Sequence, residues 1–547
     1  MGKSLIRFVA VLLAAALCFG CVTFAAGSDT KETLRVGLFY GSTALPGANL
    51  ENSVGSGYRF GWYDDNLTFH QLGSSAETQI SVVKTQNVTL SGGNYVDGTG
   101  SVTVGCFHLQ LPTTYTSFEE AQAAASAVSN GFPAWIEGTY YVRVGAYTTK
   151  DEALAAQSAL GLSTATVVGT SGYAVTVVVT KTGKPIFQFD GGAEYSLGIR
   201  PNLDDSVKTV TWFKGYRYYG GFQYRRSGGN ITVINIVDLE DYIKGVLPYE
   251  MNNAWPLEAL KAQAVCARTY AVTNTVSHAS SGFDVCNNTH CQMYQGLNLA
   301  NDRTDQAVEE TAGEYVRYQG QPAITYYSAS DGGATEDVRN IWNSTANLPH
   351  LKGIIDPYEA DLADSISQYN WTVTVSKSEI ASKLQSKGYN CGAIVDAYVA
   401  ELSETGNPKT ITFVDANGKK WSFGPETLRI WFSLRSNRFT VGGGSVSNTY
   451  YVNGTSDTLS SVSGAYAVGG DGTVSTISGT PYVATASGTG LLGSATSTTS
   501  SGTSVTFTGS GYGHNVGMSQ QGARAMALRG MDYIDILTFY FTDITVG

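Results

Sequence analysis

One glutamate lies in a setting that could support proton transfer. Glu250 falls between two predicted helices and is flanked by Tyr249, Met251 and Trp255. A carboxyl group among such apolar side chains loses hydration, and this raises its pKa. A raised pKa is what a general acid needs to protonate a leaving oxygen at neutral pH. Because most glutamates are solvated surface charges, an ordinary loop carboxylate is the alternative.

A second group of residues has the types that metal ions prefer. Cys286, His290 and Cys291 lie within six residues, and His278 lies eight residues upstream of Cys286. Two thiolates and an imidazole can supply a tetrahedral zinc set. Because His290 and Cys291 are adjacent, we expect them to point in different directions, so that one of them binds together with Cys286. The alternative is a disulfide between Cys286 and Cys291, which an oxidising compartment would permit.

Capping signals predict the elements around Glu250. A strand at residues 233–237 leads into Asp238, which can cap a helix. We expect Pro248 to end that helix and Pro256 to open a second, alanine-rich one. Glu250 would then lie in the loop between them. The apolar face of the first helix would consist of Leu239, Tyr242, Ile243 and Val246.

The composition narrows the classes of function. The chain has 547 residues, enough for two to four folded units. Charged residues make up 14% of it and the formal net charge is −11, which argues against binding to nucleic acid, a process driven by phosphate neutralisation. It also argues against a polybasic membrane-surface protein. With 33 tyrosines and 8 tryptophans, a neutral glycan is a better match, because these rings bind sugars through their apolar sides.

The first 26 residues form a predicted targeting segment. Lys3 and Arg7 precede an apolar stretch, and small residues would permit cleavage before Ala26. The segment is a signal peptide or, since it is just long enough to span a bilayer, an uncleaved anchor. In both cases we expect the chain to be exported to the cell envelope or beyond. The five cysteines after the leader are too few for a disulfide scaffold.

An internal repeat marks a small domain at residues 103–180. Residues 116–128 predict an amphipathic helix, and a second copy at 148–160 follows at an offset of 32. Each copy is preceded and followed by β-forming residues, which predicts a βαββαβ unit with one four-stranded sheet and two helices on one face. The stretch 140–147 resembles the SPOR domain, a module that in its family binds glycan strands lacking stem peptides. A generic small α+β domain is the alternative.

The remaining segments complete a predicted α+β multidomain fold. Residues 33–100 are β-rich, and residues 181–440 look like the main domain. Residues 441–504 consist almost entirely of Gly, Ser, Thr, Val, Ala and Tyr, which predicts either a flexible insertion or a set of weakly specified β-hairpins. Residues 505–547 form a C-terminal segment of the main domain.

Several motifs together resemble the SpoIID/LytB (stage II sporulation protein D) family, in the order in which that family has them. They lie at residues 238–251, 255–271, 284–294, 327–333 and 513–520. The resemblance implies a SpoIID-like β-rich core with helices. Residues 33–100 would be its first β segment, so that the SPOR-like unit is inserted into it.

The resemblance implies a lytic transglycosylase that acts on peptide-free peptidoglycan strands. The catalytic Glu of the Gly-Val-x-Pro-x-Glu-Met motif falls on Glu250. It would protonate the oxygen leaving C1 of N-acetylmuramic acid and then take the proton of the C6 hydroxyl, giving a 1,6-anhydro end. No cofactor is needed for this chemistry. A hydrolytic glycosidase would need a second carboxylate, for which Glu258 and Asp331 are the candidates.

The resemblance also suggests ligands and partners. Some members hold a structural zinc near Cys286, for which we favour Cys286, Cys291 and His278, with His290 as a substitute. His514 lies in a glycine-rich loop that lets the backbone approach a ligand, and Asn515 stands where the family usually has glycine. The residues expected to line the glycan groove are Tyr249, Tyr327, Ser328, Ser330, His514, Ser519 and Gln520.

Two further readings of the sequence remain open. Ser519 can cap a helix that ends near Gly530, and a tight turn before that cap would by itself explain the glycines around His514. Arg268 either contacts substrate or forms an ion pair in the core, and we expect the ion pair. LytB members are described as amidase enhancers, so the rival functions are a wall-binding protein that stimulates a cell-wall amidase and a purely glycan-binding structural protein.

Overall fold

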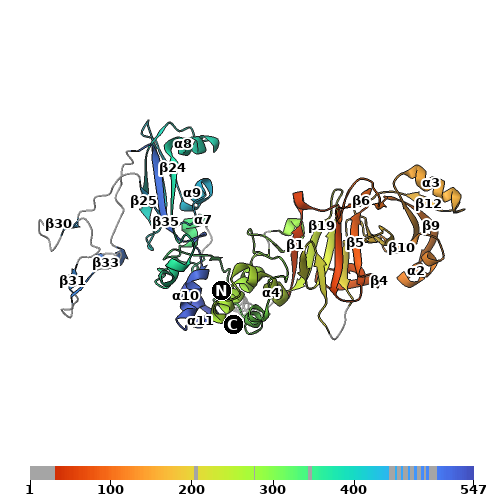
Figure 1. Cartoon of the computed structure of the whole chain (residues 1–547), viewed down its shortest axis with the longest axis horizontal. Coiled ribbons are helices and arrows are strands. Elements are labelled where there is room, and N and C mark those ends of the chain that lie inside the picture. The colour runs from red at the N-terminus through yellow and green to blue at the C-terminus, as the bar shows by residue number, and fades with distance from the viewer. Residues whose placement is uncertain are drawn as a thin grey trace, which may run out of the picture. The chain divides into compact units, whose positions relative to one another are not determined.

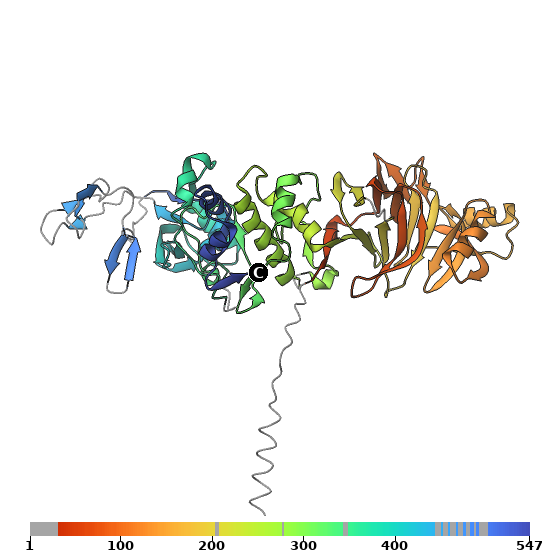
Figure 2. The ribbon, with the colours of Figure 1, turned by 90° about the horizontal axis from the view of Figure 1, so that it is seen from below.

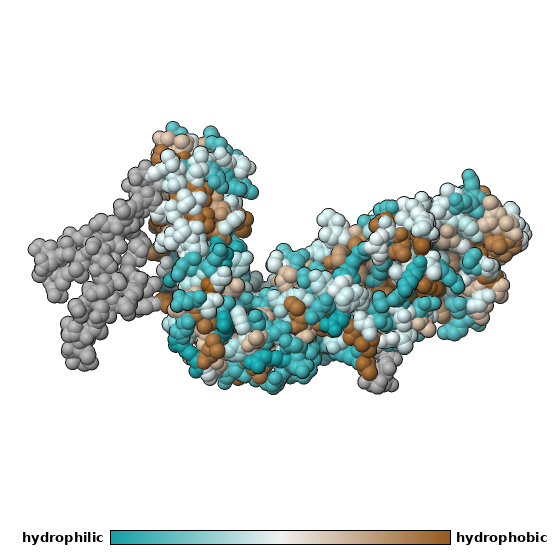
Figure 3. Space-filling model, viewed as in Figure 1, coloured by the Kyte–Doolittle hydropathy of each residue, from teal (hydrophilic) through white to brown (hydrophobic). Residues whose placement is uncertain are grey.

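The protein is described here from a computed structural model. Its described residues are 31–202, 207–275, 278–342, 348–442 and 502–547, with the backbone of short strands between 450 and 491. The predicted leader lies outside them. The described residues form an α+β protein with several sheets. No helix in these ranges has the length and apolar character needed to cross a membrane. Polar and apolar residues are interspersed over the face in Figure 3.

A strand and a helix bring Glu250 to its place. β19 (Thr232–Asp238) leads directly into α4 (Leu239–Glu250). The Asp238 carboxylate accepts the backbone N–H groups of Glu240 and Asp241. These N–H groups have no partner within the helix, so the side chain stabilises the first turn. The predicted cap is confirmed.

The prediction that Pro248 ends this helix and leaves Glu250 in a loop is wrong. α4 contains Pro248 and continues to Glu250, and the N–H of Met251 donates to the carbonyl of Leu247. A proline loses its own hydrogen bond to the residue four positions earlier. In the last turn of α4 this loss costs little, because the next hydrogen bond, from the Met251 N–H to the Leu247 carbonyl, is still formed. Glu250 is therefore fixed on a helix end.

The second helix, α5 (Leu257–Thr273), begins directly after Pro256, as predicted. It packs against α4, α6 (Asp302–Glu309), α10 (Gln520–Leu528) and α11 (Tyr533–Tyr540). In Figures 1 and 2 the blue C-terminal helices lie beside the green helices of this region. Residues from both halves of the sequence thus share one hydrophobic core.

A seven-stranded sheet places the start of the described chain beside the candidate metal ligands. The strand order is β20-β1-β19-β18-β15-β3-β4. β1 runs antiparallel to β19 and parallel to β20, where Gly37 faces Cys286. The chain leaves this sheet after β4 and returns at β15, and residues 103–180 lie between these two strands in sequence. The bounds are β1 (Thr33–Phe39), β3 (Tyr58–Tyr63), β4 (Phe69–Ser75), β15 (Leu197–Pro201), β18 (Gly221–Arg225) and β20 (Val285–Cys286).

The repeat in residues 103–180 has the predicted order of strands and helices. α2 (Phe118–Ser126) and α3 (Lys150–Ala159) are capped by Ser117 and Thr149. Both helices pack on one face of the strands, against Val142 and Val144 among others. The strands of the repeat are β9 (Phe107–Tyr115), β10 (Gly131–Ile136), β11 (Thr139–Tyr147) and β12 (Thr166–Val168).

The repeat does not form a four-stranded sheet of its own, contrary to the prediction. The strands belong to a ten-stranded sheet with the order β12-β9-β11-β10-β14-β13-β5-β2-β16-β17. β10 pairs in parallel with β14, so the free backbone groups at its edge are satisfied by a strand from outside the repeat. The additional strands are β2 (Gly47–Val54), β5 (Gln79–Lys84), β13 (Val175–Val179), β14 (Pro185–Asp190), β16 (Val210–Phe213) and β17 (Tyr216–Tyr218).

Residues 370–442 and 504–510 build a second hydrophobic core. β35 (Ser504–Ser510) lies between β24 (Asn370–Ser376) and β28 (Phe439–Gly442) and is antiparallel to both. The other elements here are α8 (Lys377–Ser386), β25 (Ile394–Leu402), β26 (Pro408–Asp415), β27 (Lys420–Phe423) and α9 (Pro425–Phe432).

The Gly/Ser/Thr-rich segment connects β28 to β35. The described part of its backbone pairs as β-hairpins, which was one of the two predicted alternatives. The paired strands are β29 (Tyr450–Tyr451) with β30 (Thr458–Leu459), β31 (Tyr466–Val468) with β32 (Val474–Thr476), and β33 (Tyr482–Thr485) with β34 (Gly488–Leu491).

Candidate active site

A cavity of about 340 Å³ lies at the end of α4, and we call it the Glu250 cavity. Residues from distant parts of the sequence meet there. Those predicted from the sequence as site residues are Glu250, His290, Cys291, Tyr327, Ser328, His514 and Gln520. Sequence reasoning missed four aromatic residues of the wall, which are Tyr270, Tyr326, Trp342 and Tyr512. Tyr326 precedes Tyr327 and Tyr512 lies two residues before His514, so both could have been included on that ground, whereas Trp342 carries no local signal.

Glu250 is half-buried, and the loss of hydration around its carboxyl raises its pKa. The backbone N–H of Met293 donates to Glu250 Oε1 at 3.1 Å, and this bond, with hydrogen bonds from Gln520 and Tyr327, partly offsets the effect of burial. The position at the C-terminal end of α4 acts in the same direction as burial, because the helix dipole disfavours negative charge there. Both effects favour the protonated form of the carboxyl, which is the form that a general acid needs.

The groups around Glu250 are themselves held by α4 and α5. Gln292 is buried, accepts the hydroxyl of Tyr242 at 2.9 Å and donates to the carbonyl of Ala267 at 3.1 Å. The amide of Gln520 donates to the Gln263 side chain at 3.3 Å. These bonds fix the loop after β20 and the start of α10 against the two helices, so the donors to Glu250 are preorganised.

His514 is a fixed, neutral residue of the cavity wall. Burial lowers its pKa to about 4, so the ring is uncharged at neutral pH. Its Nδ1 accepts the N–H of Val516 at 3.1 Å, which leaves the proton on Nε2. The next residue, Asn515, has a φ of 64°, a conformation that asparagine tolerates better than most residues. The loop geometry expected of a glycine is therefore retained in this sequence.

Three residues predicted to line the groove do not line this cavity. The Tyr249 hydroxyl donates to the carbonyl of Gln295 at 3.1 Å. Ser330 and Ser519 are buried and donate to Glu359 instead. Ser519 also caps α10, as predicted. All three positions follow or precede a cavity residue in sequence, and adjacency alone did not show which side chains face the cavity.

Glu250 is the only carboxylate among the described residues that line the cavity. Glu258 accepts a hydrogen bond from Lys261 and another from the backbone N–H of Tyr533. Asp331 is fully buried away from the wall. Neither of the candidates for a second catalytic carboxylate therefore faces the cavity.

Asp331 belongs to a buried group with Asp356 and Glu359, whose ligand oxygens lie within 4.8 Å of one another. Burial raises the pKa of Asp331 well above its usual range and raises that of Asp356 as well. Among the described residues no hydrogen-bond partner is found for Asp331 Oδ2. Asp331 is therefore the member best suited to carry a proton, which reduces repulsion within the group.

The four candidate metal ligands converge at the edge of the cavity. One ligand atom from each of His278, Cys286, His290 and Cys291 lies within 4.8 Å of the others. Cys291 Sγ is 3.4 Å from His278 Nε2 and 3.5 Å from His290 Nδ1. The expectation that His290 and Cys291 point apart is wrong. They lie in a turn rather than in a strand, so adjacent side chains can face one point.

No disulfide joins Cys286 and Cys291, and the cysteines that the structure describes are free thiols. The pKa of Cys286 is lowered, chiefly because the Cys291 thiol hydrogen-bonds to it. The ring of His278 stacks on Phe283 at 4.8 Å between centroids, which orients the imidazole. The cluster thus offers two sulfur and two nitrogen donors, the number and types of a tetrahedral zinc site.

Arg268 forms the ion pair in the core that was predicted. Its side chain is 0% exposed, and it donates to Glu240 with Nε at 2.8 Å and Nη2 at 2.6 Å. Further bonds reach the carbonyls of Val308 and Glu314. The pair joins the first turn of α4 to α5, so it supports the helix that carries Glu250.

Comparison with known proteins gives three relatives of interest. An uncharacterized protein of Brachyspira hyodysenteriae is 42% identical over 141 residues, or 26% of this chain and 38% of that protein. The amidase enhancer of Bacillus subtilis is 32% identical over 347 residues, or 56% of this chain and 40% of that protein. Stage II sporulation protein D of Bacillus subtilis is 27% identical, over 57% of this chain and 75% of that protein. The chain thus spans about two fifths of the length of the first two.

A family model described as stage II sporulation protein matches residues 227–318. This range contains β19, α4, α5 and β20, with Glu250 and all four residues of the cysteine–histidine cluster. The model therefore falls on the elements that build one side of the Glu250 cavity. On the basis of this match and of its relatives, the chain contains a domain of the SpoIID/LytB family.

Proposed function

We propose that this protein is a lytic transglycosylase that cuts peptide-free glycan strands of peptidoglycan in the cell envelope. The observation that carries the proposal is a single half-buried carboxyl group with a raised pKa in the wall of a cavity that has no other carboxylate among its described residues. A hydrolytic glycosidase needs two carboxylates. One acid is enough when the nucleophile is a hydroxyl of the substrate itself.

In the proposed mechanism, protonated Glu250 gives its proton to the glycosidic oxygen as the bond to C1 of N-acetylmuramic acid breaks. The resulting carboxylate is stabilised by the donors from Met293, Gln520 and Tyr327. It then takes the proton of the C6 hydroxyl as that oxygen bonds to C1. The products are a 1,6-anhydro end and a free hydroxyl on the leaving sugar, and Glu250 is again protonated.

The walls of the cavity suit a sugar polymer. Tyr326 and Trp342 pack edge to face at 4.8 Å between centroids, and the His514 ring lies 5.1 Å from Trp342. Such rings present apolar faces to sugar rings, while the neutral His514 adds a polar group without a charge. The SPOR-like repeat would provide a second contact with the glycan.

We further propose that the cysteine–histidine cluster holds a structural zinc ion. The residues present fit the ion, because His278, Cys286, His290 and Cys291 bring four donors of the preferred types to one point. Bound zinc would supply rigidity to the turn that carries His290 and Cys291, both of which line the Glu250 cavity. With four protein ligands no position would be left for activating water.

The purified chain should contain about one zinc ion per molecule by elemental analysis. Cys286→Ser should abolish this, whereas Cys106→Ser, a cysteine outside the cluster, should retain it. Removal of the ion by a chelator should lower the melting temperature by about 5 °C or more, since a ligand that binds only the folded state stabilises it. A zinc-free chain, or equal zinc loss in both variants, would contradict the assignment.

Digestion of purified glycan strands, with and without stem peptides, tests the proposed function. Analysed by mass spectrometry, the peptide-free strands should yield 1,6-anhydro ends and the peptide-bearing strands should yield fewer. Ends that have gained water would instead establish hydrolysis.

The amidase enhancer among the relatives makes a second function worth testing in the same assay. That function predicts no cleavage of strands by the chain alone, retained binding to them, and faster release of stem peptides when a cell-wall amidase is added. If the chain cleaves strands and does not change the rate of the amidase, the amidase-enhancer function is excluded.

A further inference from the structure

Two arginines stand directly opposite each other in the seven-stranded sheet. β3 and β15 are antiparallel, and Arg59 is the cross-strand partner of Arg200. Like charges in this position repel, and the proximity of Arg200 lowers the pKa of Arg59, although burial is the larger cause. Among the described residues neither arginine forms an ion pair with a carboxylate.

The same face of the sheet carries hydrogen-bond donors without acceptors. Arg59 Nε, Arg59 Nη2 and the Tyr63 hydroxyl are buried and have no partner among the described residues. Residues at alternate positions of a strand share a face, which places Arg59 and Tyr63 together with Arg200 of the neighbouring strand. Buried donors of this kind are normally satisfied. Within the described part of the chain these donors therefore lack an acceptor, and beside two guanidinium groups the best acceptor is an anion.

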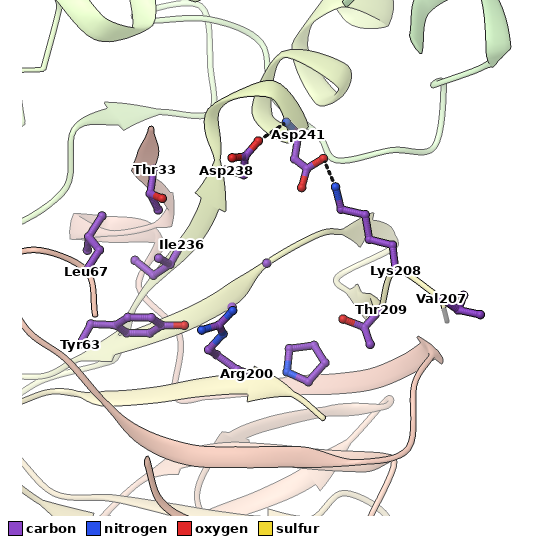
Figure 4. A pocket seen from close by; sticks show the side chains of 13 residues that line it. Thr33, Tyr63, Leu67, Arg200, Val207, Lys208, Thr209, Ile236, Asp238 and Asp241 are labelled. Carbon is purple, nitrogen blue, oxygen red and sulfur yellow. Dashed lines mark hydrogen bonds and ion pairs between the residues drawn. The ribbon is translucent and has the colours of Figure 1, made fainter. Parts of the chain in front are cut away.

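Tyr63 and Arg200 line a cavity of about 500 Å³, distinct from the Glu250 cavity, which we call the arginine cavity. Arg59 is the cross-strand neighbour of Arg200 and is not part of the lining. Figure 4 shows the Tyr63 hydroxyl and the Arg200 guanidinium directed toward each other at one end of it. Thr209 lies beside them, and the other end carries Lys208 and two carboxylates.

The carboxylates at the far end are already engaged. Asp241 pairs with Lys208, and Asp238 accepts backbone N–H groups of α4. They do not neutralise the arginines. Residues 203–206, which include Asp204 and Asp205, lie outside the described residues, and the experiment below addresses these two directly.

We propose that the arginine cavity binds the free lactyl carboxylate of a peptide-free muramic acid residue, an inference that rests on the proposed function. Hydrolysis of the amide bond to a stem peptide leaves a carboxylate on the lactyl group, whereas an intact stem peptide blocks it. Arg200 donates to this carboxylate, Tyr63 adds a hydroxyl donor, and Arg59 adds positive charge from the adjacent strand. The site would thus recognise the chemical mark that separates stripped from unstripped glycan.

The arginine cavity and the Glu250 cavity lie at opposite ends of one helix. Asp238 and Asp241, at the start of α4, line the former, and Glu250, its last residue, lines the latter. A helix of 12 residues is about 18 Å long, so a strand of a few sugars could occupy both sites. The helix that carries the proposed acid would then also be contacted where it begins.

The experiment measures binding of N-acetylmuramic acid by calorimetry to the full chain carrying Glu250→Gln, which separates binding from cleavage. N-acetylglucosamine, which lacks the carboxylate, and inorganic phosphate serve as comparison ligands. Arg200→Gln in this background should weaken N-acetylmuramic acid binding at least tenfold, and Arg339→Gln, an exposed arginine paired with Asp337, should not change it. Without ligand, Arg200→Gln should raise the melting temperature, since it relieves the repulsion from Arg59.

Three results would overturn the proposal. Equal binding by the Arg200 variant and its control would show that the carboxylate is bound elsewhere, and stronger binding of phosphate would show a different anion site. A lower melting temperature on Arg200→Gln, matched by Asp204→Asn or Asp205→Asn, would show an internal ion pair. If 1,6-anhydro ends form but the Arg200-dependent binding is absent, only this inference fails. If the binding is present but no strand is cut, the proposed enzyme fails and the site stands.

Discussion

Replacement of Glu250 by glutamine should reduce the turnover of peptide-free glycan strands by about 10³-fold or more. A positioned general acid increases the rate by about 10² to 10⁴-fold, and in the proposed mechanism Glu250 takes part in both proton transfers. The amide has nearly the same size and can still accept the Met293 N–H. Strand binding should therefore stay within a few fold, as measured by co-sedimentation with the same strands.

Glu258→Gln is the matched control, because this residue was the other acidic candidate near the motif but does not line the cavity. Its turnover should change less than about twofold if a single acid carries the chemistry. A loss comparable to that of Glu250→Gln would indicate a paired-carboxylate mechanism.

The rate of strand cleavage should also depend on pH, and this is measured on the wild-type protein with Glu250→Gln as the inactive control. Burial raises the pKa of Glu250 above its ordinary value, and the reaction begins from the protonated form. The rate should therefore be highest below the raised pKa and fall as the pH increases through it. Because no second carboxylate faces the cavity among the described residues, we expect one descending limb rather than a bell.

Replacement of Glu240 by leucine should destabilise the protein by about 3 kcal/mol, since it leaves a buried guanidinium without its carboxylate. Arg268 is 0% exposed, whereas Glu240 retains 29% exposure, which places the expected loss at the lower end of the range for buried pairs. Urea unfolding followed by circular dichroism measures this. The pair also ties α4 to α5, so the loss should appear in the transition of the helical region.

The double variant Glu240→Leu with Arg268→Met should recover much of the lost stability, because both charges are then removed together. Arg339→Gln, which breaks an exposed pair with Asp337, should have a much smaller effect on the free energy of unfolding, because solvent screens exposed pairs. If Glu240→Leu lowered the free energy of unfolding no more than Arg339→Gln does, the ion pair with Glu240 would not be what compensates the burial of Arg268.

Much of the region around Glu250 could be predicted because local signals agree with the fold. Asp238 and Pro256 act as helix signals in the sequence and do so in the structure. The prediction that Pro248 ends its helix was wrong, because the effect of a proline on a helix depends on how many turns follow it. His290 and Cys291 were misjudged for a related reason, because whether neighbours diverge depends on the local backbone conformation, which the sequence there does not specify.

Long-range contacts were the part that could not be predicted. Nothing near Glu359 indicates that Ser330 and Ser519 would donate to it rather than to substrate. The sheet around the repeat at residues 103–180 is a similar case. Its strands and helices follow from periodicity, but the pairing of β10 with β14 does not, nor does the burial of His108 and Arg143, which are 0% and 7% exposed.

The strands that flank the Gly/Ser/Thr-rich segment have a consequence for how this protein can be altered. Gly442 of β28 and Thr506 of β35 are cross-strand partners, so the segment leaves and re-enters the fold at neighbouring points. Antiparallel neighbours can be joined by a turn of only a few residues. The segment is therefore an insertion between two neighbouring strands. Its length and sequence can change in evolution, or it can be replaced by another domain or a reporter protein, without altering how the other strands and helices are connected.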